Sequence, residues 1–442
     1  MMKMFNKNNA FFSIITILVL LLSSSTISAQ NIQTTYTGTE RLILQFISPD
    51  IIIPDDYLTI QEGIDNSAPG NVIFVRAGIY QENINVDKKD IQLIGESKLN
   101  TTIDGGSKSK DTVKINAENV TIRGFSIING NTKSTGAWDI AGIKVYFSNA
   151  KIKDNLIMWN RIGINAVDIA YDLEILNNSF VDNGLLVANY EYNDVHTIKS
   201  YMHTIENNTL NDKPLYYFKN QKDIVVPDDA GQVLLANCTN VTIKDTHFAK
   251  SGFPIILGFC SKCIVENNTV NDAWGEIILL QSNNCTIQNN TASGLIYGVC
   301  LDYKSKDNIV RYNKVRNSMA GIVLMTSSSN NSVYENCISG NSIGVCLQGK
   351  AHDNNVTGNV LFKNTVGFKI RDNSNNNRIT KNKIMKSFYQ AVSLGRTKND
   401  WNNNYWNRPR LMPKVIYSYV LVGSIFIPYF IADIDPRPAR KL

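Results

Sequence analysis

The chain has 442 residues, of which 43% are hydrophobic and 19% charged, and its formal net charge is +6 at pH 7. This composition excludes collagen, long coiled coils, and disordered chains of low hydrophobicity and high net charge. The chain has no block of lysines and arginines of the kind that indicates nucleic-acid binding, so we expect no nucleic-acid partner. The composition is strongly biased toward asparagine, with 56 residues, about one in eight.

Residues 1–29 have the features of a secretory signal peptide. Lys3 and Lys7 precede an apolar run from residue 10 to residue 22, and small residues lead to Ala29. We expect cleavage after Ala29, with an uncleaved N-terminal anchor as the alternative. The prediction is a protein that is secreted, periplasmic or attached to the cell surface. Residues 30–56 are then an N-terminal lead-in.

The next segment, residues 57–68, is predicted to be a short amphipathic helix. Thr59 and Glu62 form a T-x-x-E capping box, and Pro69 with Gly70 ends the helix. Short strand-like segments follow, beginning with VIFV, INV and IQLIG. A helix at this point would cover the open first turn of a stacked β-structure, whose sheet edges would otherwise be exposed.

The spacing of the strand-like segments loosens between residues 126 and 236, which predicts loops there. Binding residues often lie on loops held by a rigid scaffold. Aromatic and acidic residues in this part of the chain could stack on a sugar ring and bond to its hydroxyls. The alternative is that the aromatic residues pack the loops against the scaffold. The carbohydrate-binding candidates are Trp138, Asp139, Tyr171, Asp172, Tyr190 and Tyr192.

Two residue types recur with one period in the following segment. Glycine returns every 23 residues, and asparagine every 22 or 23. The glycine series is Gly275, Gly298, Gly321, Gly344 and Gly367. The asparagine series is Asn268, Asn290, Asn313, Asn336, Asn359 and Asn382. Such a repeat predicts one structural unit stacked many times.

Each unit holds short, often alternating apolar pieces and no helical period, which predicts strands. We therefore expect an all-β fold, a single-stranded right-handed parallel β-helix of about 13 turns over residues 57–400. Asparagine suits a left-handed corner and can form a hydrogen-bonded ladder, and glycine suits a corner where a Cβ would clash. Leucine-rich repeats have this length, but their dense leucine pattern is missing.

Four cysteines share repeat positions in neighbouring turns. Cys238 and Cys260 occupy one position, and Cys263 and Cys285 another. Stacked neighbours would lie within the Cα distance of a disulfide, and export permits oxidation. Free stacked thiols and at least one disulfide both stay open at this point.

Residues 401–442 lose the repeat and are predicted to form a C-terminal cap. The apolar stretch Val415 to Ile431 has 17 residues, at the lower limit for a membrane span. Its β-branched and aromatic content favours a terminal strand over a membrane anchor. We expect no membrane span in the mature chain.

Several stretches resemble one branch of the pectin-lyase-like right-handed β-helix superfamily. They are YLTIQEGIDNSAPGNVIFVRAGIYQENINVDKKDIQLIGE with TTIDGG and VTIRGFSI, then KPLYYFKNQKDIVVPDDAGQVLLANCTNVTIKD, and the ending WNNNYWNRPR. The chain is similar to the NosD-type, or CASH-domain, proteins over roughly residues 50–442. This resemblance implies the fold, and as one functional alternative a periplasmic role in copper delivery to nitrous oxide reductase.

No recognisable catalytic constellation is present, which favours a non-enzymatic role. The QDTL motif of pectin methylesterase and the G-H-G and R-I-K motifs of polygalacturonases are absent. Asp302 follows a strand and is interpreted as a solvated carboxylate. His196 and His203 are interpreted as polar surface residues, so we predict neither a metal site nor a cofactor.

The sequence thus predicts a secreted or cell-surface β-helix protein that binds a polysaccharide or another envelope component through loops of residues 126–236. A polysaccharide lyase, hydrolase or epimerase is the first alternative. A NosD-like copper-maturation factor is the second.

Overall fold

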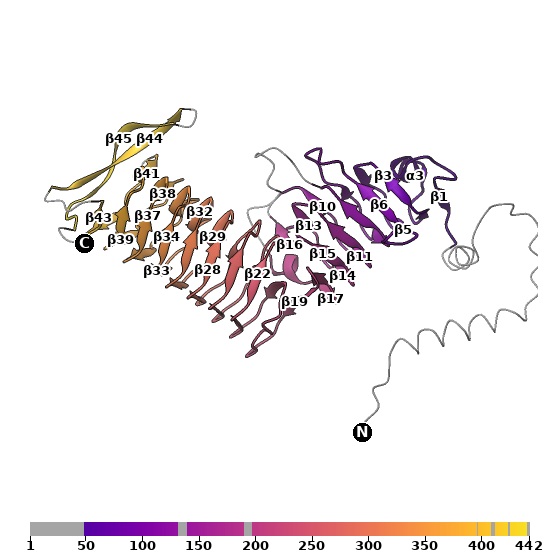
Figure 1. Ribbon diagram of the computed structural model, residues 1–442, viewed down its shortest axis with the longest axis horizontal. Coiled ribbons are helices and arrows are strands. Elements are labelled where there is room, and N and C mark those ends of the chain that lie inside the picture. The colour runs from indigo at the N-terminus through magenta and orange to yellow at the C-terminus, as the bar shows by residue number, and fades with distance from the viewer. Residues whose placement is uncertain are drawn as a thin grey trace, which may run out of the picture. The chain divides into compact units, whose positions relative to one another are not determined.

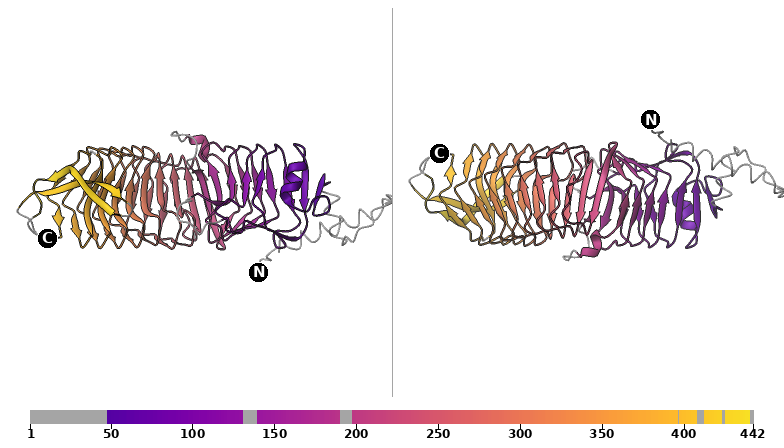
Figure 2. Two further views of the ribbon diagram at one scale, coloured as in Figure 1. Left: turned by 90° about the horizontal axis from the view of Figure 1, so that it is seen from above. Right: turned by 90° about the horizontal axis from the view of Figure 1, so that it is seen from below.

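The computed structural model describes residues 48–130, 139–189, 197–395, 397–407, 412–422 and 425–439 (Figure 1). The predicted signal peptide lies outside these residues, as does most of the predicted lead-in. From Pro49 onward the chain forms one compact unit. Its strands stack turn upon turn in long rows (Figure 2), as the repeat predicted.

The first half of this unit has three parallel sheets, here called N1, N2 and N3. N1 contains β1 (Ile51–Ile53), β2 (Val72–Val75), β5 (Gln92–Gly95), β8 (Thr121–Arg123), β11 (Lys151–Lys153), β14 (Glu174–Leu176) and β17 (Thr204–Glu206). N2 contains β3 (Gly78–Tyr80), β6 (Thr101–Asp104), β9 (Ser126–Ile128), β12 (Leu156–Met158), β15 (Ser179–Val181) and β18 (Thr209–Leu210). N3 contains β4 (Ile84–Val86), β7 (Val113–Ile115), β10 (Ala141–Val145), β13 (Ile162–Val167) and β16 (Leu185–Asn189).

The second half has three further sheets, C1, C2 and C3. C1 contains β19 (Lys213–Lys219), β20 (Gln232–Ala236), β23 (Ile255–Gly258), β26 (Ile277–Leu280), β29 (Tyr297–Asp302), β32 (Ala320–Leu324), β35 (Ile343–Leu347), β38 (Val366–Arg371), β41 (Tyr389–Leu394), β44 (Lys414–Val422) and β45 (Ile425–Asp435). C2 contains β21 (Thr242–Lys244), β24 (Ile264–Glu266), β27 (Thr286–Gln288), β30 (Ile309–Arg311), β33 (Ser332–Tyr334), β36 (Asn355–Thr357), β39 (Arg378–Thr380) and β42 (Asp400–Asn402). C3 contains β22 (His247–Ala249), β25 (Thr269–Asn271), β28 (Thr291–Ser293), β31 (Lys314–Arg316), β34 (Cys337–Ser339), β37 (Val360–Phe362), β40 (Lys383–Met385) and β43 (Tyr405–Trp406).

Among the described strands, every pairing is parallel except those of two hairpins. One is β18 with β19, where the chain passes from the first half to the second, and the other is β44 with β45. N1 has seven strands and C2 has eight, so the coil has more turns than the predicted 13. The predicted bounds of residues 57–400 are too narrow, because β1 already pairs with β2, and β42 and β43 still continue C2 and C3.

The predicted helix is present but shorter, as α3 (Ile60–Asn66). Thr59 and Glu62 form the predicted capping box, and Ile60 and Ile64 are buried in the core of the first half. A short 3-10 helix, η1 (Ile198–Tyr201), lies between β16 and β17. Neither described helix is long and apolar enough to cross a membrane.

The recurring asparagines lie directly over one another inside the coil. From Asn268 to Asn382, each side-chain amide donates to the next asparagine oxygen at 2.9–3.0 Å. The prediction that these asparagines themselves adopt the left-handed backbone is wrong. That conformation belongs to the preceding residue, such as Asn267 or Tyr312, because the turn occurs one position earlier.

The recurring glycines lie at or just before the start of the C1 strands, where two turns approach closely. A Cβ on Gly321 would lie 2.4 Å from Ile338 Cγ2 and 2.6 Å from the carbonyl oxygen of Gly344. A Cβ on Gly344 or Gly367 would likewise lie too close to the backbone of the next turn. A side chain at these positions would therefore force neighbouring turns apart.

The C-terminal segment that includes residues 415–431 forms strands β44 and β45. This agrees with the favoured interpretation of a terminal strand. β44 pairs with β41 at Ser418, so the hairpin extends sheet C1 beyond the last complete turn.

Candidate functional site

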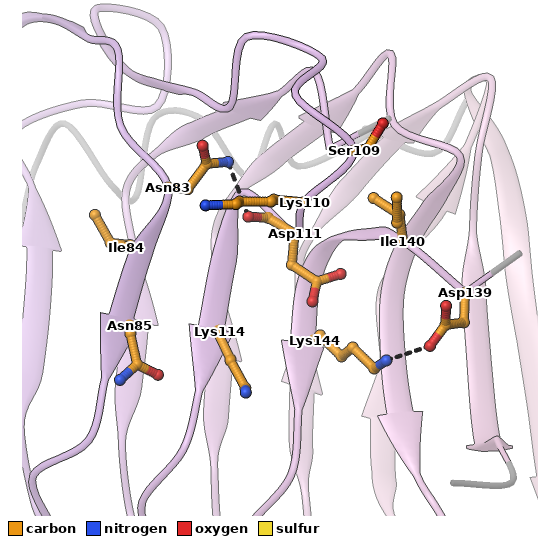
Figure 3. A pocket seen from close by; sticks show the side chains of 10 residues that line it. All are labelled: Asn83, Ile84, Asn85, Ser109, Lys110, Asp111, Lys114, Asp139, Ile140 and Lys144. Atoms are coloured by element: carbon orange, nitrogen blue, oxygen red, sulfur yellow. Dashed lines mark hydrogen bonds and ion pairs between the residues drawn. The ribbon is translucent and has the colours of Figure 1, made fainter. Parts of the chain in front are cut away.

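Two hollows lie next to each other, and Asp139 lines both of them. The first, of about 340 Å³, is lined by residues from β4, β7, β10 and the segments that precede them (Figure 3). The second, of about 310 Å³, includes residues of β13 and β16 together with residues at or before the start of C1 strands. The two hollows together therefore extend from sheet N3 to sheet C1.

Polar side chains in the first hollow follow one register row of sheet N3. Asn85, Lys114 and Lys144 occupy equivalent positions on β4, β7 and β10, and Figure 3 shows them side by side. The Lys144 ammonium is almost fully buried and forms an ion pair with Asp139. A buried ammonium needs such a partner, which fixes the position of Asp139 between the hollows.

The same row also approaches an aromatic ring. The Nζ atoms of Lys114 and Lys144 lie 4.5 and 5.3 Å from the centroid of the Tyr146 ring. Lys110 lines the hollow as well. Lys110 and Lys114 form no ion pair with the described residues, and with Lys144 they outnumber the two acidic residues of the lining, Asp111 and Asp139, so the hollow is positively charged overall.

The second hollow is mostly apolar and contains one acidic group. Its walls include Phe253, Ile296, Tyr297 and Met319. Glu276, which directly precedes β26, also lines the hollow although only 6% of its surface is exposed. Desolvation raises the pKa of Glu276 to about 8, and the negative charge of Asp302 adds to this shift. The carboxyl group of Glu276 is therefore mostly protonated at neutral pH.

The interpretation of Asp302 as a solvated carboxylate is wrong. Asp302 is only 7% exposed, because it lies on a face of β29 that is covered by other side chains. Burial raises its pKa to about 6, and hydrogen bonds from the Thr326 side chain and the Tyr303 backbone partly oppose this shift. Glu276, directly before β26, and Asp302, at the end of β29, are thus two buried carboxyl groups of neighbouring turns.

A guanidinium group also interacts electrostatically with Asp139. Arg161 precedes β13 and stacks over the ring of Trp274 at 3.8 Å from the centroid. Desolvation lowers the pKa of Arg161, and the negative charge of Asp139 opposes that change. Such stacking helps to hold the guanidinium group in place.

Of the three carbohydrate-binding candidates that the structure describes, Asp139 lines both hollows. Tyr171 and Asp172 lie at the corner between β13 and β14 and line neither hollow. The other three, Trp138, Tyr190 and Tyr192, lie outside the described residues.

Sequence reasoning missed Lys114, Lys144, Glu276 and Tyr297. A usable signal existed, because VKI and IKV place a lysine between β-branched residues on a strand. A charged residue in such a position needs a partner or a polar hollow.

A third hollow, of about 530 Å³, lies at a corner of the second half. Lys304, Lys306 and His352 contribute to its lining. Replacing Lys304 and Lys306 therefore removes two positive charges from the third hollow, which makes it a matched control for replacing Lys110 and Lys114 in the first.

The four stacked cysteines are buried, and all seven cysteines are free thiols in the structure. Their thiols donate to backbone carbonyl oxygens, Cys238 to Phe218 at 3.3 Å and Cys263 across the turn to Cys238 at 3.8 Å. The interpretation of His203 as a surface residue is wrong, because it is 1% exposed. Burial lowers the pKa of His203 to about 4.

Similar proteins of known description share short stretches with this chain. A pectinesterase/pectinesterase inhibitor from Ficus pumila var. awkeotsang is 35% identical over 95 residues, which are 18% of this chain and 17% of that protein. A cell surface glycoprotein from Methanothermus fervidus is 42% identical over 76 residues, 17% of this chain and 12% of that protein. The matches therefore span less than a fifth of either relative.

Solved structures that resemble the chain include two epimerases. The A-module of the mannuronan C-5 epimerase AlgE6 from Azotobacter vinelandii is 14% identical, with a TM-score of 0.37, 86% of this chain covered and 92% of that chain. The periplasmic alginate epimerase AlgG is 13% identical, with a TM-score of 0.36, 79% of this chain covered and 73% of that chain.

One family matches over a longer part of the chain. Residues 189–299 and 233–417 match the family described as periplasmic copper-binding protein (NosD). Together the two stretches span just over half of the 442 residues. They contain every turn of the second half and its asparagine ladder. With its parallel β-helix and this match, the chain belongs to the NosD family.

Proposed function

We propose that this protein is an exported, non-catalytic protein that binds an acidic polysaccharide along the two hollows joined at Asp139. The observation that carries the proposal is the placement of Asn85 and Lys114 at equivalent positions on neighbouring strands, with Lys110 lining the same hollow. Amide and ammonium donors at a strand spacing of about 4.8 Å suit a repeating ligand with a carboxylate or hydroxyls on each unit.

The comparisons support the proposal in outline. One relative is named for pectin, a polysaccharide, and another is named a cell surface glycoprotein. The family description is periplasmic. These names favour an exported protein and a carbohydrate ligand.

The copper-maturation alternative receives no support from the residues that the structure describes. No group of three or more of their histidine, cysteine, aspartate or glutamate side chains could hold a metal ion. Both ring nitrogens of His203 are engaged, Nδ1 with the Leu173 backbone at 3.3 Å and Nε2 with the Ser200 carbonyl at 2.9 Å. His196 lies outside the described residues. The described residues do not fit a resident copper ion.

One observation favours the enzymatic alternative, a lyase, hydrolase or epimerase. Two buried carboxyl groups with raised pKa values interact electrostatically, Glu276 at the wall of the second hollow and Asp302 at the end of β29 on the next turn. Such groups occur at catalytic sites. Formation of new reducing ends, unsaturated uronate or epimerised residues from a bound polymer would favour this alternative over simple binding.

The binding proposal is tested with the full chain and soluble polymers. Polygalacturonate and alginate should retard the protein in affinity electrophoresis, and dextran, which is neutral, should not. The double variant Lys110→Gln/Lys114→Gln should bind at least about tenfold more weakly. The matched control Lys304→Gln/Lys306→Gln loses the same charge in the third hollow and should bind like the original protein. Equal loss in both variants, or no retardation by any polymer, would contradict the proposal.

A further inference from the structure

We propose that Glu276 recognises the carboxylate of a uronic acid residue in the second hollow, by donating a hydrogen bond from its protonated carboxyl group. This inference rests on the proposed function and assigns a specific subsite to it. The ligand class is an oligouronide whose chain passes Asp139 from the first hollow into the second.

Glu276 is a buried acid without a partner that lines the hollow. It is 6% exposed, and it has no recorded hydrogen bond or ion pair with any other described residue. It lines the second hollow together with Asp139 and Tyr297. Because this carboxyl group lines the hollow and bonds to no described residue, a ligand in the hollow is the partner that its position favours.

The surroundings of Glu276 decide its charge state. Asp302 on β29 is the group whose negative charge acts on it most directly. Tyr297 and Cys300, also on β29, are neutral at physiological pH because burial raises both pKa values. Asp139 lies across the hollow and is paired with Lys144. No cation lines this hollow among the described residues, which leaves the carboxyl group protonated near neutral pH.

A protonated carboxyl group has a different ligand preference from an ionised one. The ionised form would repel a uronate, whereas the protonated form donates a charge-assisted hydrogen bond to it. The rings of Phe253 and Tyr297 add apolar surface for the C–H face of a sugar. Lys110 and Lys114 in the adjoining hollow favour an acidic neighbour in the same chain.

The experiment measures binding of a galacturonic acid hexamer by calorimetry between pH 6 and pH 9.5. The original protein should bind at least about tenfold more weakly at pH 9.5 than at pH 6. Glu276→Gln, which also donates but cannot ionise, should keep most of the affinity at pH 6 and lose most of the pH dependence. Glu276→Ala should bind weakly at every pH. Glu206→Gln, at an exposed position on β17, should behave like the original protein.

The same series separates the two proposals. A hexamer whose carboxylates are reduced to alcohols should bind weakly at pH 6. Binding that is equal for both hexamers, independent of pH, or as weak in Glu276→Gln as in Glu276→Ala would overturn the uronate subsite. An original protein that binds no acidic oligomer at any pH would instead overturn the proposed function. Circular dichroism melting curves establish that each variant is folded.

Discussion

Asp435 on β45 accepts two hydrogen bonds from Asn404, from its backbone N–H and its side-chain amide, each 3.1 Å long. The indole nitrogen of Trp406 donates to the same carboxylate oxygen at 2.9 Å. In each earlier turn of this ladder, the side-chain oxygen of the asparagine in the following turn accepts these two hydrogen bonds. A second ladder of stacked asparagines ends at Asn399. There Asp433 accepts the hydrogen bonds of the Asn399 backbone N–H and side-chain amide in the same way. The C-terminal hairpin thus completes the hydrogen bonding of two ladders that have no further turn.

The first prediction concerns this ladder end. Asp435→Ala leaves three buried donors without an acceptor, and it should lower the free energy of unfolding by at least about 3 kcal/mol. Asp435→Asn keeps an acceptor oxygen and should cost clearly less. Urea unfolding followed by circular dichroism measures both changes. Asp372→Ala removes an exposed ion pair with Arg371 and is the control, expected within about 1 kcal/mol of the original protein.

The second prediction concerns the middle of the ladder. Asn313 accepts from the backbone and the side chain of Asn290 at 3.0 Å, and donates to Asn336 at 3.0 Å. Asn313→Ala should lower the free energy of unfolding by about 3 kcal/mol, because buried partners lose their bonds. Asn100→Ala, at an exposed position, should have little effect on the same unfolding curve. A ladder that contributes little would show equal midpoints for the two variants.

The third prediction concerns the glycine row. Gly321→Ala places a methyl group 2.4 Å from Ile338 Cγ2 and should destabilise the protein by about 1–3 kcal/mol. Gly252 lies one repeat of 23 residues before Gly275, but the atom nearest to a new Cβ there is 3.5 Å away. Gly252→Ala should therefore be tolerated, and thermal unfolding compares the two. Similar melting temperatures would show that the neighbouring turns adjust to a side chain.

The fold could be predicted because its cause is periodic. Asn313 and Gly321 each recur every turn, so one register explains both the hydrogen-bonded ladder and the close approach of turns. The site could not be predicted in this way. Asp139 and Glu276 are far apart in the sequence and belong to different halves of the coil. They meet only because the β18–β19 hairpin changes the set of sheets, and neither residue has a periodic signal.

The fourth prediction concerns the thiols. Cys337 is exposed and the other six cysteines are buried, so one thiol should react quickly with Ellman's reagent in the folded protein. Seven should react in denaturant without a reductant. A count of five would reveal a disulfide, with the stacked pairs Cys238–Cys260 and Cys263–Cys285 as the first to examine by mass spectrometry. Cys337→Ser removes the fast phase and serves as the control.

The fifth prediction concerns the pH dependence of stability. The folded-state pKa of Glu276, about 8, lies above its ordinary value of 4.5. The folded state therefore binds this proton more tightly than the unfolded state does. The resulting stabilisation is complete below pH 4.5 and is lost as the pH rises to about 8. Glu276→Gln cannot ionise, and between pH 5 and pH 8.5 its free energy of unfolding should fall less than that of the original protein, by on the order of 4 kcal/mol.

Two other buried groups, Asp302 and His203, also titrate and limit the pH range in which the effect of Glu276 on stability can be measured. Asp302 has a folded-state pKa of about 6 and acts in the same direction at lower pH. His203, with a pKa lowered to about 4, acts in the opposite direction, because protonation of its buried ring destabilises the fold as the pH falls below 6.5. Both groups have completed their titration by about pH 7.5, so the difference between the original protein and Glu276→Gln above that pH belongs to Glu276. Parallel unfolding curves between pH 7 and pH 8.5, with Glu206→Gln as the reference, would show that Glu276 is already ionised in the folded protein.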